Sequence, residues 1–563
     1  MSYCLEEARI EADELDAVVF YDNPVLSFDR VIKSILSVAP LGEKQWVAAS
    51  SAFFRSKLDV ARYVRNVLKV DVPLLYTRHH LSHAASAFYP SPFREAAVLT
   101  VDGVGEWATT SIAQASDTEI QILKEIHYPH SIGLLYSTFT YFCGFKVNSG
   151  EYKLMGLAPY GEPRYVDRIW EKLVFTKPDG SFRLETGYFG YLTTDRMSNE
   201  RFDALFDGPP RVPEAAITQR EMDVAASIQV VTDDLMLGLA RHAKELTGMD
   251  NLCLAGGVAL NCVSNGHLLR EDLFEDVWIQ PAAGDAGGAL GAALLASYRR
   301  FDVPRPVAQD RRDAQHASLL GPAYSSAEVR AYLDVHDYPY ELLSDEQERA
   351  NCAAEAIAEG KVVGLFSGRM EFGPRALGAR SILGDPRRSE TQEVMNLKIK
   401  YRESFRPFAP AVSEERASEY FELDCASPYM LIVAPVRAER RREIPTCKGA
   451  RRDVLEWVRE TRSDIPAVTH VDYSARVQTV GSEDGTMLRR IIDAFERLTG
   501  CAVLVNTSFN VRGEPIVCRP KDAYQCFMKT GMDVLIIEDC VLRKDKQPRG
   551  SMTEGWMDEH PFD

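Results

Sequence analysis

The sequence has no apolar stretch that approaches the roughly 20 residues needed to cross a bilayer. Its N-terminus, MSYCLEEARIEADELD, is acidic and lacks the apolar core of a signal peptide. It also lacks an excess of positive charge, because 82 Asp and Glu residues outnumber 65 Lys and Arg residues and give a formal net charge of -17. Nucleic acids and anionic membranes are bound by positive surfaces. We therefore expect a cytoplasmic protein with neither nucleic acid nor membrane as a partner.

Paired cysteines are also missing. The 11 cysteines include no CxxC pair and no closely spaced framework. This distribution is typical of a reducing compartment and provides no thiolate cage for a metal. Any metal site in this chain must therefore be built from imidazoles and carboxylates.

The 563 residues are enough for two or more domains. Short apolar strands alternate with amphipathic helices in the first half, which is the pattern of the α/β class. The pattern predicts buried strands at 15–22 and 72–78, a strand meander from 96 to 128, and helices at 216–248 and 286–300. The polar, proline-containing segment 301–318 lacks periodicity. We place the boundary there, with domains at 1–315 and 316–563.

Two histidines and two aspartates are candidate metal ligands. In a helix, His79 and His83 lie one turn apart on the same face, as two ligands of one ion require. Asp102 closes the apolar strand AVLTVDG, and Asp285 lies at a turn before a Gly-rich helix. This donor set suits Fe²⁺, Mn²⁺ or Zn²⁺. The alternatives are histidines with a core or surface role and aspartates that cap turns or helices.

Two glycine-rich segments could bind a nucleotide. VDGVGEWATTSI, which contains Gly103, lets backbone amides approach an anion. GGVALN (256–261) offers the free amides of a helix N-terminus. Many α/β turns share these features, so neither segment identifies a site alone.

Five segments of the first half occur in a familiar order: HHLSHAASAF, VDGVGE, GEYKLMGLAPYG, GGVALNCVSN and PAAGDAGGALGAAL. Together they resemble the N-terminal domain of the NodU/CmcH/TobZ O-carbamoyltransferases. That domain is similar to TsaD, the tRNA threonylcarbamoyl-transfer subunit, and has an actin-like ATPase fold. The resemblance implies that His79, His83, Asp102 and Asp285 hold a metal, with iron first. It also implies a nucleotide-binding set of Gly103, Lys153, Gly256, Gly257 and Asn261.

The second half concentrates cationic and amide side chains in four segments. GRMEFGPRALGARSILGDPR (368–387) surrounds its arginines with glycines, which let the backbone bend around an anion. In NLKIKYRESFRPFAPAV (396–412), period-2 spacing predicts one face of an extended segment for Lys398, Lys400 and Arg402. THVDYSARVQTV (469–480) and VNTSFNVRGEPIV (505–517) add further groups. In an acidic chain this predicts a buried site for polyanionic substrates, although an Arg-rich surface loop is the simpler alternative for the first segment.

These segments resemble, in order, the C-terminal domain of the same carbamoyltransferases, which is similar to the YrdC fold that makes carbamoyl-type adenylates. The resemblance implies binding of carbamoyl phosphate and of ATP, with Mg²⁺, by Arg375, Arg380, Lys400, Arg406, Arg476, Asn506 and Ser508.

The implied enzyme forms carbamoyl adenylate and then carbamoylates a hydroxyl of a natural product or sugar. A homodimer is the default expectation. The chain begins after an N-terminal hairpin of these relatives, so a histidine that could serve as the transfer base is not expected here. Three alternatives remain: a threonylcarbamoyl-type tRNA-modifying enzyme, a sugar-kinase-like ATPase, or a nucleotide- and metal-binding module without transfer activity.

Overall fold

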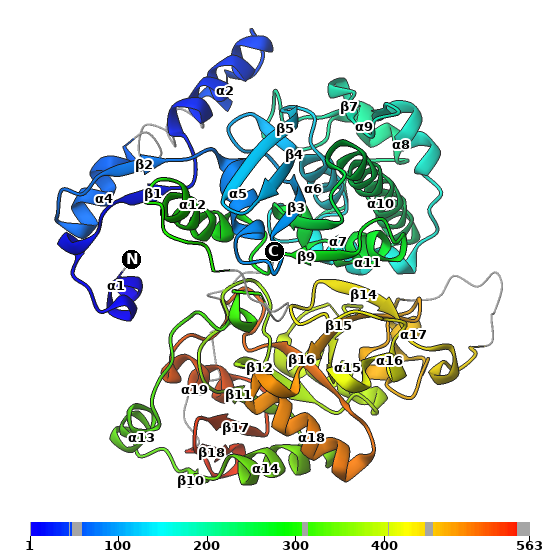
Figure 1. Ribbon diagram of the computed structural model, residues 1–563. Coiled ribbons are helices and arrows are strands. Elements are labelled where there is room, and N and C mark those ends of the chain that lie inside the picture. Colours follow the sequence, from blue (N-terminus) through cyan, green and yellow to red (C-terminus); the bar gives the residue numbers. More distant parts are fainter. Residues whose placement is uncertain are drawn as a thin grey trace. The chain divides into compact units, whose positions relative to one another are not determined.

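The computed structural model describes residues 2–43, 45–47, 59–306, 313–403, 405–444 and 454–548. The chain divides into two compact units, Met1–Ala314 and Gln315–Asp563 (Figure 1). The division falls within the segment 301–318. Each unit combines helices with a sheet of at least five strands, which confirms the predicted α/β class.

The sheet of the first unit has the strand order β5-β4-β3-β8-β9. Strands β3 (Glu95–Val101), β4 (Ala108–Ser116) and β5 (Glu119–His127) form the predicted antiparallel meander. Strands β8 (Asn251–Ala255) and β9 (Asp276–Ile279) run parallel to β3. Because β3 and β8 are parallel neighbours, the residues that follow them meet at one edge of the sheet. Asp102 and Gly256 occupy these two positions.

Helices cover both faces of this sheet, with α5 (His79–Phe88) and α12 (Asp285–Arg299) on one side and α6 (Ile132–Phe142) on the other (Figure 1). Small residues let α5 and α12 approach closely. A Cβ on Gly291 would lie only 1.9 Å from the carbonyl oxygen of Ser82. This close packing brings the first turn of α12 next to α5.

Helix α10 (Gln219–Thr247) confirms the helix predicted at 216–248. It begins at a capping box made by Thr218 and Glu221, and it ends where Gly248 adopts a left-handed conformation. The unit also contains four shorter helices: α7 (Glu151–Leu157), α8 (Val166–Lys172), α9 (Glu200–Leu205) and α11 (Cys262–Arg270). Among the helices in the described parts of the chain, none combines the length and the apolar composition of a membrane span.

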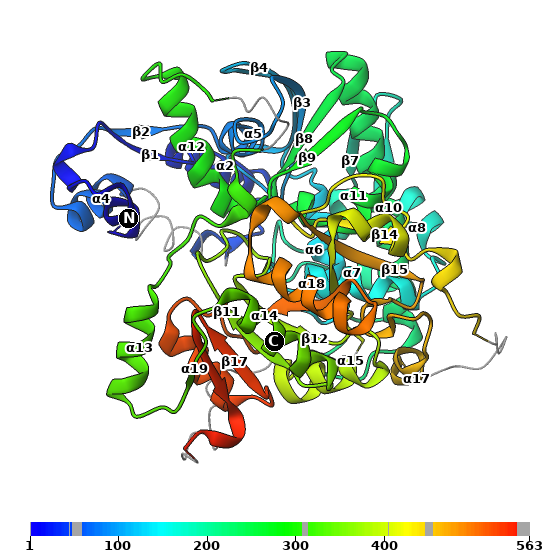
Figure 2. The ribbon, with the colours of Figure 1, turned by 60° about the horizontal axis from the view of Figure 1, so that its bottom comes forward.

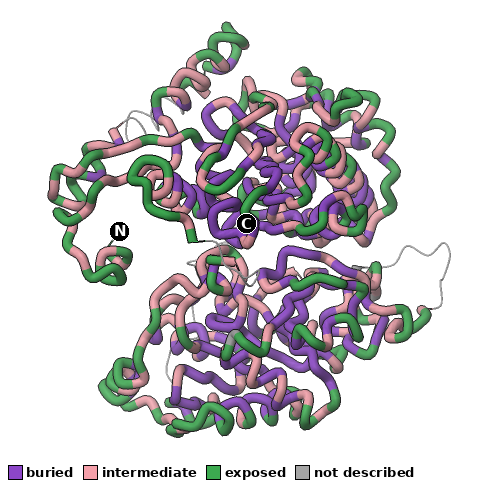
Figure 3. The backbone as a smooth tube through the Cα atoms, viewed as in Figure 1, coloured by how far each residue is buried: buried purple, intermediate pink, exposed green. Residues whose placement is uncertain are grey.

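The prediction of buried strands at 15–22 and 72–78 is wrong in its burial. Strands β1 (Val18–Phe20) and β2 (Leu74–Tyr76) pair only with each other, in a separate parallel ribbon. Their residues are half-buried or exposed (Figure 3). A two-stranded ribbon has too few neighbours to bury both of its faces. The surrounding segment contains α1 (Ser2–Ala8), α2 (Pro24–Ser37) and α4 (Val60–Leu68).

The second unit is built on a nine-stranded mixed sheet with the order β10-β18-β17-β11-β12-β16-β13-β15-β14. Figure 2 shows several of its strands, among them β11, β12, β15 and β17. Its strands are β10 (Glu341–Leu342), β11 (Val363–Phe366), β12 (Arg380–Gly384), β13 (Ala409–Ser413), β14 (Ile432–Pro435), β15 (Ser474–Val480), β16 (Val503–Ser508), β17 (Val534–Ile537) and β18 (Cys540–Arg543). Its helices are α13 (Ser326–Val335), α14 (Glu346–Ala358), α15 (Ser389–Met395), α16 (Ala417–Tyr420), α17 (Val454–Arg459), α18 (Met487–Thr499) and α19 (Pro520–Lys529). Adjacent strands β12, β16, β13 and β15 bring the cationic segments of the second half together.

The prediction of an extended segment for Lys398, Lys400 and Arg402 is also wrong. Asn396–Lys400 forms a π-helical turn that continues α15. Met395 and Ile399, four positions apart, are both fully buried, so the helical period and not the strand period decides which residues face inward. Lys400 is consequently buried while Lys398 is exposed.

Candidate functional site

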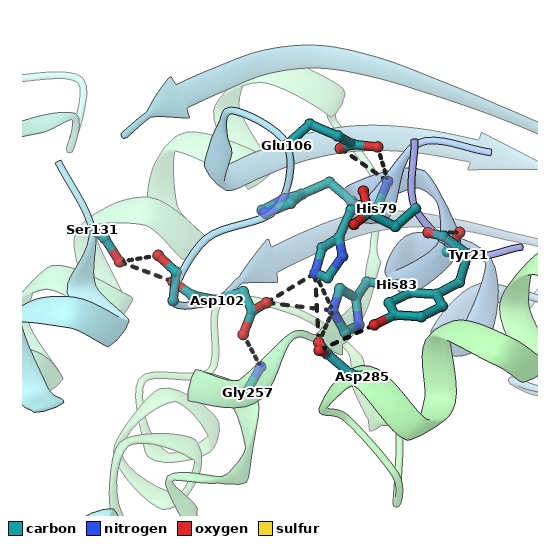
Figure 4. A network of polar contacts seen from close by, with 12 residues as sticks. Tyr21, His79, His83, Asp102, Glu106, Ser131, Gly257 and Asp285 are labelled. Atoms are coloured by element: carbon teal, nitrogen blue, oxygen red, sulfur yellow. Dashed lines mark hydrogen bonds and ion pairs between the residues drawn. The ribbon is translucent and has the colours of Figure 1, made fainter. Parts of the chain in front are cut away.

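The four predicted metal ligands come together in the first unit (Figure 4). The Nε2 atoms of His79 and His83, one turn apart on α5, are 3.0 Å from each other. Asp102 Oδ2 lies 3.0 Å from His79 Nε2 and 3.6 Å from His83 Nε2. Asp285 Oδ1, at the start of α12, lies 3.6 Å from both. Four side chains from three distant segments therefore point at one place.

The cluster has the dimensions of a single-ion site. One ligand atom from each residue can be chosen so that all four lie within 4.8 Å of one another. Two ligand atoms that each lie about 2.1 Å from one ion are themselves roughly 3.0–3.4 Å apart. The histidine side chains are buried, whereas the Asp285 side chain is 60% exposed. These residues fit a divalent cation reached from the side of Asp285.

The charges of the cluster depend on one another. Burial alone would lower the pKa of His83, but hydrogen bonds with Asp102 and Asp285 raise this pKa to about 9. Burial opposes ionisation of Asp102, yet its hydrogen bonds with His79 and His83 hold its pKa well below the usual range. The hydrogen bond with His83 likewise lowers the pKa of Asp285. Two carboxylates thus require a neighbouring positive charge, which a proton or a metal ion can supply.

Surrounding groups fix the orientation of the ligands. The amide of Gly257 donates to Asp102 Oδ1 at 3.0 Å, which leaves Oδ2 directed at the histidines. Glu106 accepts the backbone amide of His79, with distances of 2.9 and 3.1 Å to its two oxygens. The Tyr21 hydroxyl lies 3.5 Å from Asp285 Oδ2. Such outer contacts set the aim and basicity of metal ligands.

Glu106 and Tyr21 were not predicted from the sequence. The acidic residue that ends VDGVGE is a signal for Glu106, whereas nothing in the sequence around Tyr21 points to this contact.

The predicted nucleotide-binding residues divide into two groups. Gly103, Gly256 and Gly257 lie beside Asp102 at the ends of β3 and β8. A Cβ on Gly256, whose φ is +89°, would lie 2.2 Å from the carbonyl oxygen of Val101, so only glycine fits this turn. Asn261 caps α11 by accepting the Ser264 amide at 3.2 Å.

Lys153, on α7, is 1% exposed, and its ammonium lies 5.8 Å from the centre of the Phe145 ring. The structure therefore places the three glycines beside the four predicted metal ligands, while Asn261 and Lys153 belong to the helices that follow or cover the sheet.

Lys400 and Ser508 meet in the second unit. The Lys400 ammonium is buried and donates to the carbonyl and hydroxyl oxygens of Ser508 at 2.8 and 3.2 Å. It also donates to the carbonyl and Oδ1 of Asn510 at 2.8 and 2.6 Å. Burial lowers the pKa of Lys400 well below the usual range, and Arg402 and Arg406 lower it further. All four acceptors are neutral, so they do not cancel the positive charge.

The side chains of Arg380 and Asn506 donate hydrogen bonds to backbone carbonyls. The fully buried Arg380 guanidinium donates to the carbonyls of Gly368, Ala379 and Pro322 at 3.0–3.1 Å. Asn506 Nδ2 donates to the carbonyl of Ala376 at 3.2 Å. The other predicted members of this site, Arg375, Arg406 and Arg476, are half-buried. Asn506 thus contacts the backbone directly after Arg375.

Comparison with known proteins finds a matching family model for each half of the chain. Residues 1–294 match the family model described as carbamoyltransferase N-terminus, and residues 354–544 match the one described as carbamoyltransferase C-terminus. An uncharacterized protein of Synechocystis sp. is 53% identical over 100% of this chain and 92% of its own length. Nodulation protein NolNO of Sinorhizobium fredii is 35% identical over 99% of this chain and 75% of its own length.

A crystal structure of full-length HypF in the phosphate- and nucleotide-bound form aligns with 37% of this chain and 23% of its own, at 17% identity and a TM-score of 0.23. A score this low supports no structural argument.

Proposed function

The chain belongs to the carbamoyltransferase family, and from that premise we propose that it is an ATP-dependent O-carbamoyltransferase. Its donor would be carbamoyl phosphate, and its acceptor a hydroxyl group of a natural product or sugar. The observation that carries the proposal is the convergence of His79, His83, Asp102 and Asp285 on one point at the edge of the sheet. A mere structural cluster would not need a ligand as exposed as Asp285.

We propose that the second unit activates the carbamoyl group. Water cleaves carbamoyl phosphate to carbamate and phosphate. A carbamate oxygen then attacks the α-phosphorus of ATP, the bond to the β-phosphate oxygen breaks, and carbamoyl adenylate and pyrophosphate form. Lys400 supports this assignment because the four oxygens of Ser508 and Asn510 that accept from its buried ammonium are all neutral. Such fixed cations stabilise the charge that develops on phosphoryl oxygens.

Arg375, Arg406 and Arg476 would add further donors for the phosphates, in the forked geometry that guanidinium groups offer. ATP would enter as its Mg²⁺ complex. Asn506 and Arg380 would contribute through the backbone that they hold.

We propose that the first unit carries out the transfer. The acceptor oxygen attacks the carbamoyl carbon of the adenylate, the bond to the phosphate oxygen breaks, and AMP leaves as the hydroxyl loses its proton to a base. His79, His83, Asp102 and Asp285 would hold a divalent cation, iron first and manganese or zinc as alternatives, which supplies Lewis-acid polarisation when bound. The Gly257 amide keeps Asp102 aimed at the histidines. A Cβ added at Gly103 would meet nothing within 4 Å, so this glycine would leave room for a phosphate group to approach the same turn.

The activation step can be tested without knowing the acceptor. Exchange of labelled pyrophosphate into ATP would be measured with and without carbamoyl phosphate, in wild type, Arg476→Ala and Arg497→Ala. Arg497 is an exposed arginine on α18 and serves as the matched control. We expect carbamoyl-phosphate-dependent exchange in wild type and R497A, and its loss in R476A. No exchange in folded wild-type protein supplied with Mg²⁺ would refute the proposed function.

A further inference from the structure

A buried glutamate shapes the loop that carries Arg375. This loop connects β11 to β12, and Glu371, near its start, is only 5% exposed. Its Oε1 atom accepts the backbone amides of Leu377 and Ala379, both at 2.7 Å, and that of Arg380 at 3.2 Å. Three amides thus converge on one carboxylate oxygen, as they would on a bound anion. The loop is closed by its own side chain.

Two side chains from neighbouring strands hold the same stretch by its carbonyls. Gln478, on β15, donates to the carbonyl of Leu377 at 2.8 Å. Asn506, on β16, donates to the carbonyl of Ala376 at 3.2 Å and to Gln478 Oε1 at 2.7 Å. The residues after Arg375 are therefore bonded through both their amides and their carbonyls.

The residues before Arg375 are fixed as well. The Phe372 amide donates to the Ser318 carbonyl at 2.7 Å, and the Ser318 hydroxyl donates to the Phe372 carbonyl at 2.7 Å. Gly373, with φ of +137°, makes the bend that follows. Arg375 lies between these two anchored stretches.

We infer that Glu371 is a positioning residue that presents Arg375 to a phosphate-bearing substrate. The inference rests on the proposed function, because it takes Arg375 as a substrate ligand. A carboxylate is suited to this task because a charged acceptor binds amides more strongly than a neutral one. A loop that is already ordered pays little of the entropy that binding otherwise costs. Glu371 itself faces the loop backbone through Oε1.

The second oxygen of the same carboxylate supports a requirement for charge. Glu371 Oε2 is buried and has no hydrogen-bond partner among the described residues. Leaving a charged oxygen in this state is costly, so this cost must be offset by the three amide hydrogen bonds that Oε1 accepts. Glutamine keeps one acceptor oxygen and the length of the side chain while removing the charge. The pair Glu371→Gln and Glu371→Ala therefore separates charge from shape.

The test is a double-mutant cycle in the full chain, comparing wild type, E371A, R375A and the double variant, with E371Q alongside. The exchange assay would give kcat and the KM values for carbamoyl phosphate and for ATP, and calorimetric titration with each substrate would give affinity where exchange is too slow. The controls are Glu221→Gln and Glu221→Ala. Glu221 is a buried carboxylate of the first unit that likewise accepts a backbone amide, at 2.9 Å.

We expect R375A to weaken the binding of one of the two substrates. E371A should weaken the binding of the same substrate by about 10- to 100-fold, with a smaller change in kcat. E371Q should weaken the binding of this substrate less than E371A does. In the R375A background, E371A should cause no further loss of affinity. Additive costs in the double variant, or equal effects of the Glu221 and Glu371 variants, would overturn the inference. If E371A fails to fold, E371Q with R375A completes the cycle. Absence of exchange in wild type would count against the proposed function instead, and the cycle would then be read from the calorimetric affinities alone.

Discussion

Replacing Asp285 with alanine tests the metal assignment with little disturbance of the fold. The Asp285 side chain is 60% exposed, whereas that of His83 is fully buried, so D285A opens no cavity. Its carboxylate lies in the first turn of α12, where loss of a negative charge costs about 0.3–1 kcal/mol. The larger effect should appear only when a metal ion is present, because the variant loses one of four converging ligands.

The size of that effect follows from mass action. An ion at about 100 times its dissociation constant stabilises the folded state by about 2.7 kcal/mol. In a unit of this length, such a gain corresponds to a rise of roughly 5 °C in the unfolding temperature. Since each protein is compared with and without metal, the intrinsic cost of the substitution cancels.

The assay is scanning calorimetry on chelator-treated protein, titrated with Fe²⁺ without oxygen, and with Mn²⁺ or Zn²⁺. The matched control is His127→Ala, which removes a half-exposed histidine paired with Glu125 in the same unit. Wild type and H127A should gain stability with at least one of these ions, and D285A should gain little. An equal gain in D285A would mean that the ion binds elsewhere. No gain in wild type with any of the three ions would refute the metal assignment.

Three further substitutions each test one set of close contacts. Lys400→Met should lower pyrophosphate exchange at least about 100-fold and lower the unfolding temperature, because it removes the buried charge and leaves the oxygens of Ser508 without their donor. Gly291→Val should destabilise the first unit by more than about 3 kcal/mol in denaturant unfolding, since its Cβ would meet the Ser82 carbonyl at 1.9 Å. Arg305→Met should cost the same unit about 2–4 kcal/mol, because the guanidinium donates to five backbone carbonyls at 2.7–3.4 Å, and exchange by the second unit should survive.

The elements near the proposed metal site could be predicted because local patterns decide them. The i, i+4 spacing of His79 and His83 requires only a helix, and Asp102 follows a strand whose apolar run ends abruptly. For Asp285, the sequence shows only a second aspartate at a turn and does not show that it lies near the histidines. Its distance from the histidines depends on the close packing at Gly291, which is a tertiary contact that the sequence does not reveal.

The second unit shows where prediction from the sequence ends. Lys400 was expected on an extended face, but the buried residues Met395 and Ile399 impose a helical turn, and Ser508 and Asn510 receive the ammonium. Glu371 could not be predicted from the sequence because its partners are backbone amides, and a backbone amide is present at almost every residue whatever its side chain. The arginines can be identified from the sequence, but the groups that accept their hydrogen bonds cannot.

The proposed metal site joins residues that are made at very different times. His79 and Asp102 emerge early from a ribosome, whereas Asp285 and the helix that packs on α5 come only after most of the first unit has been synthesised. A nascent chain therefore carries an incomplete ligand set until Asp285, about halfway along its 563 residues, has been added. If the cluster binds the proposed ion, loading would be a late step of biosynthesis, and retention of the ion would distinguish chains that have completed the first unit from those that have not.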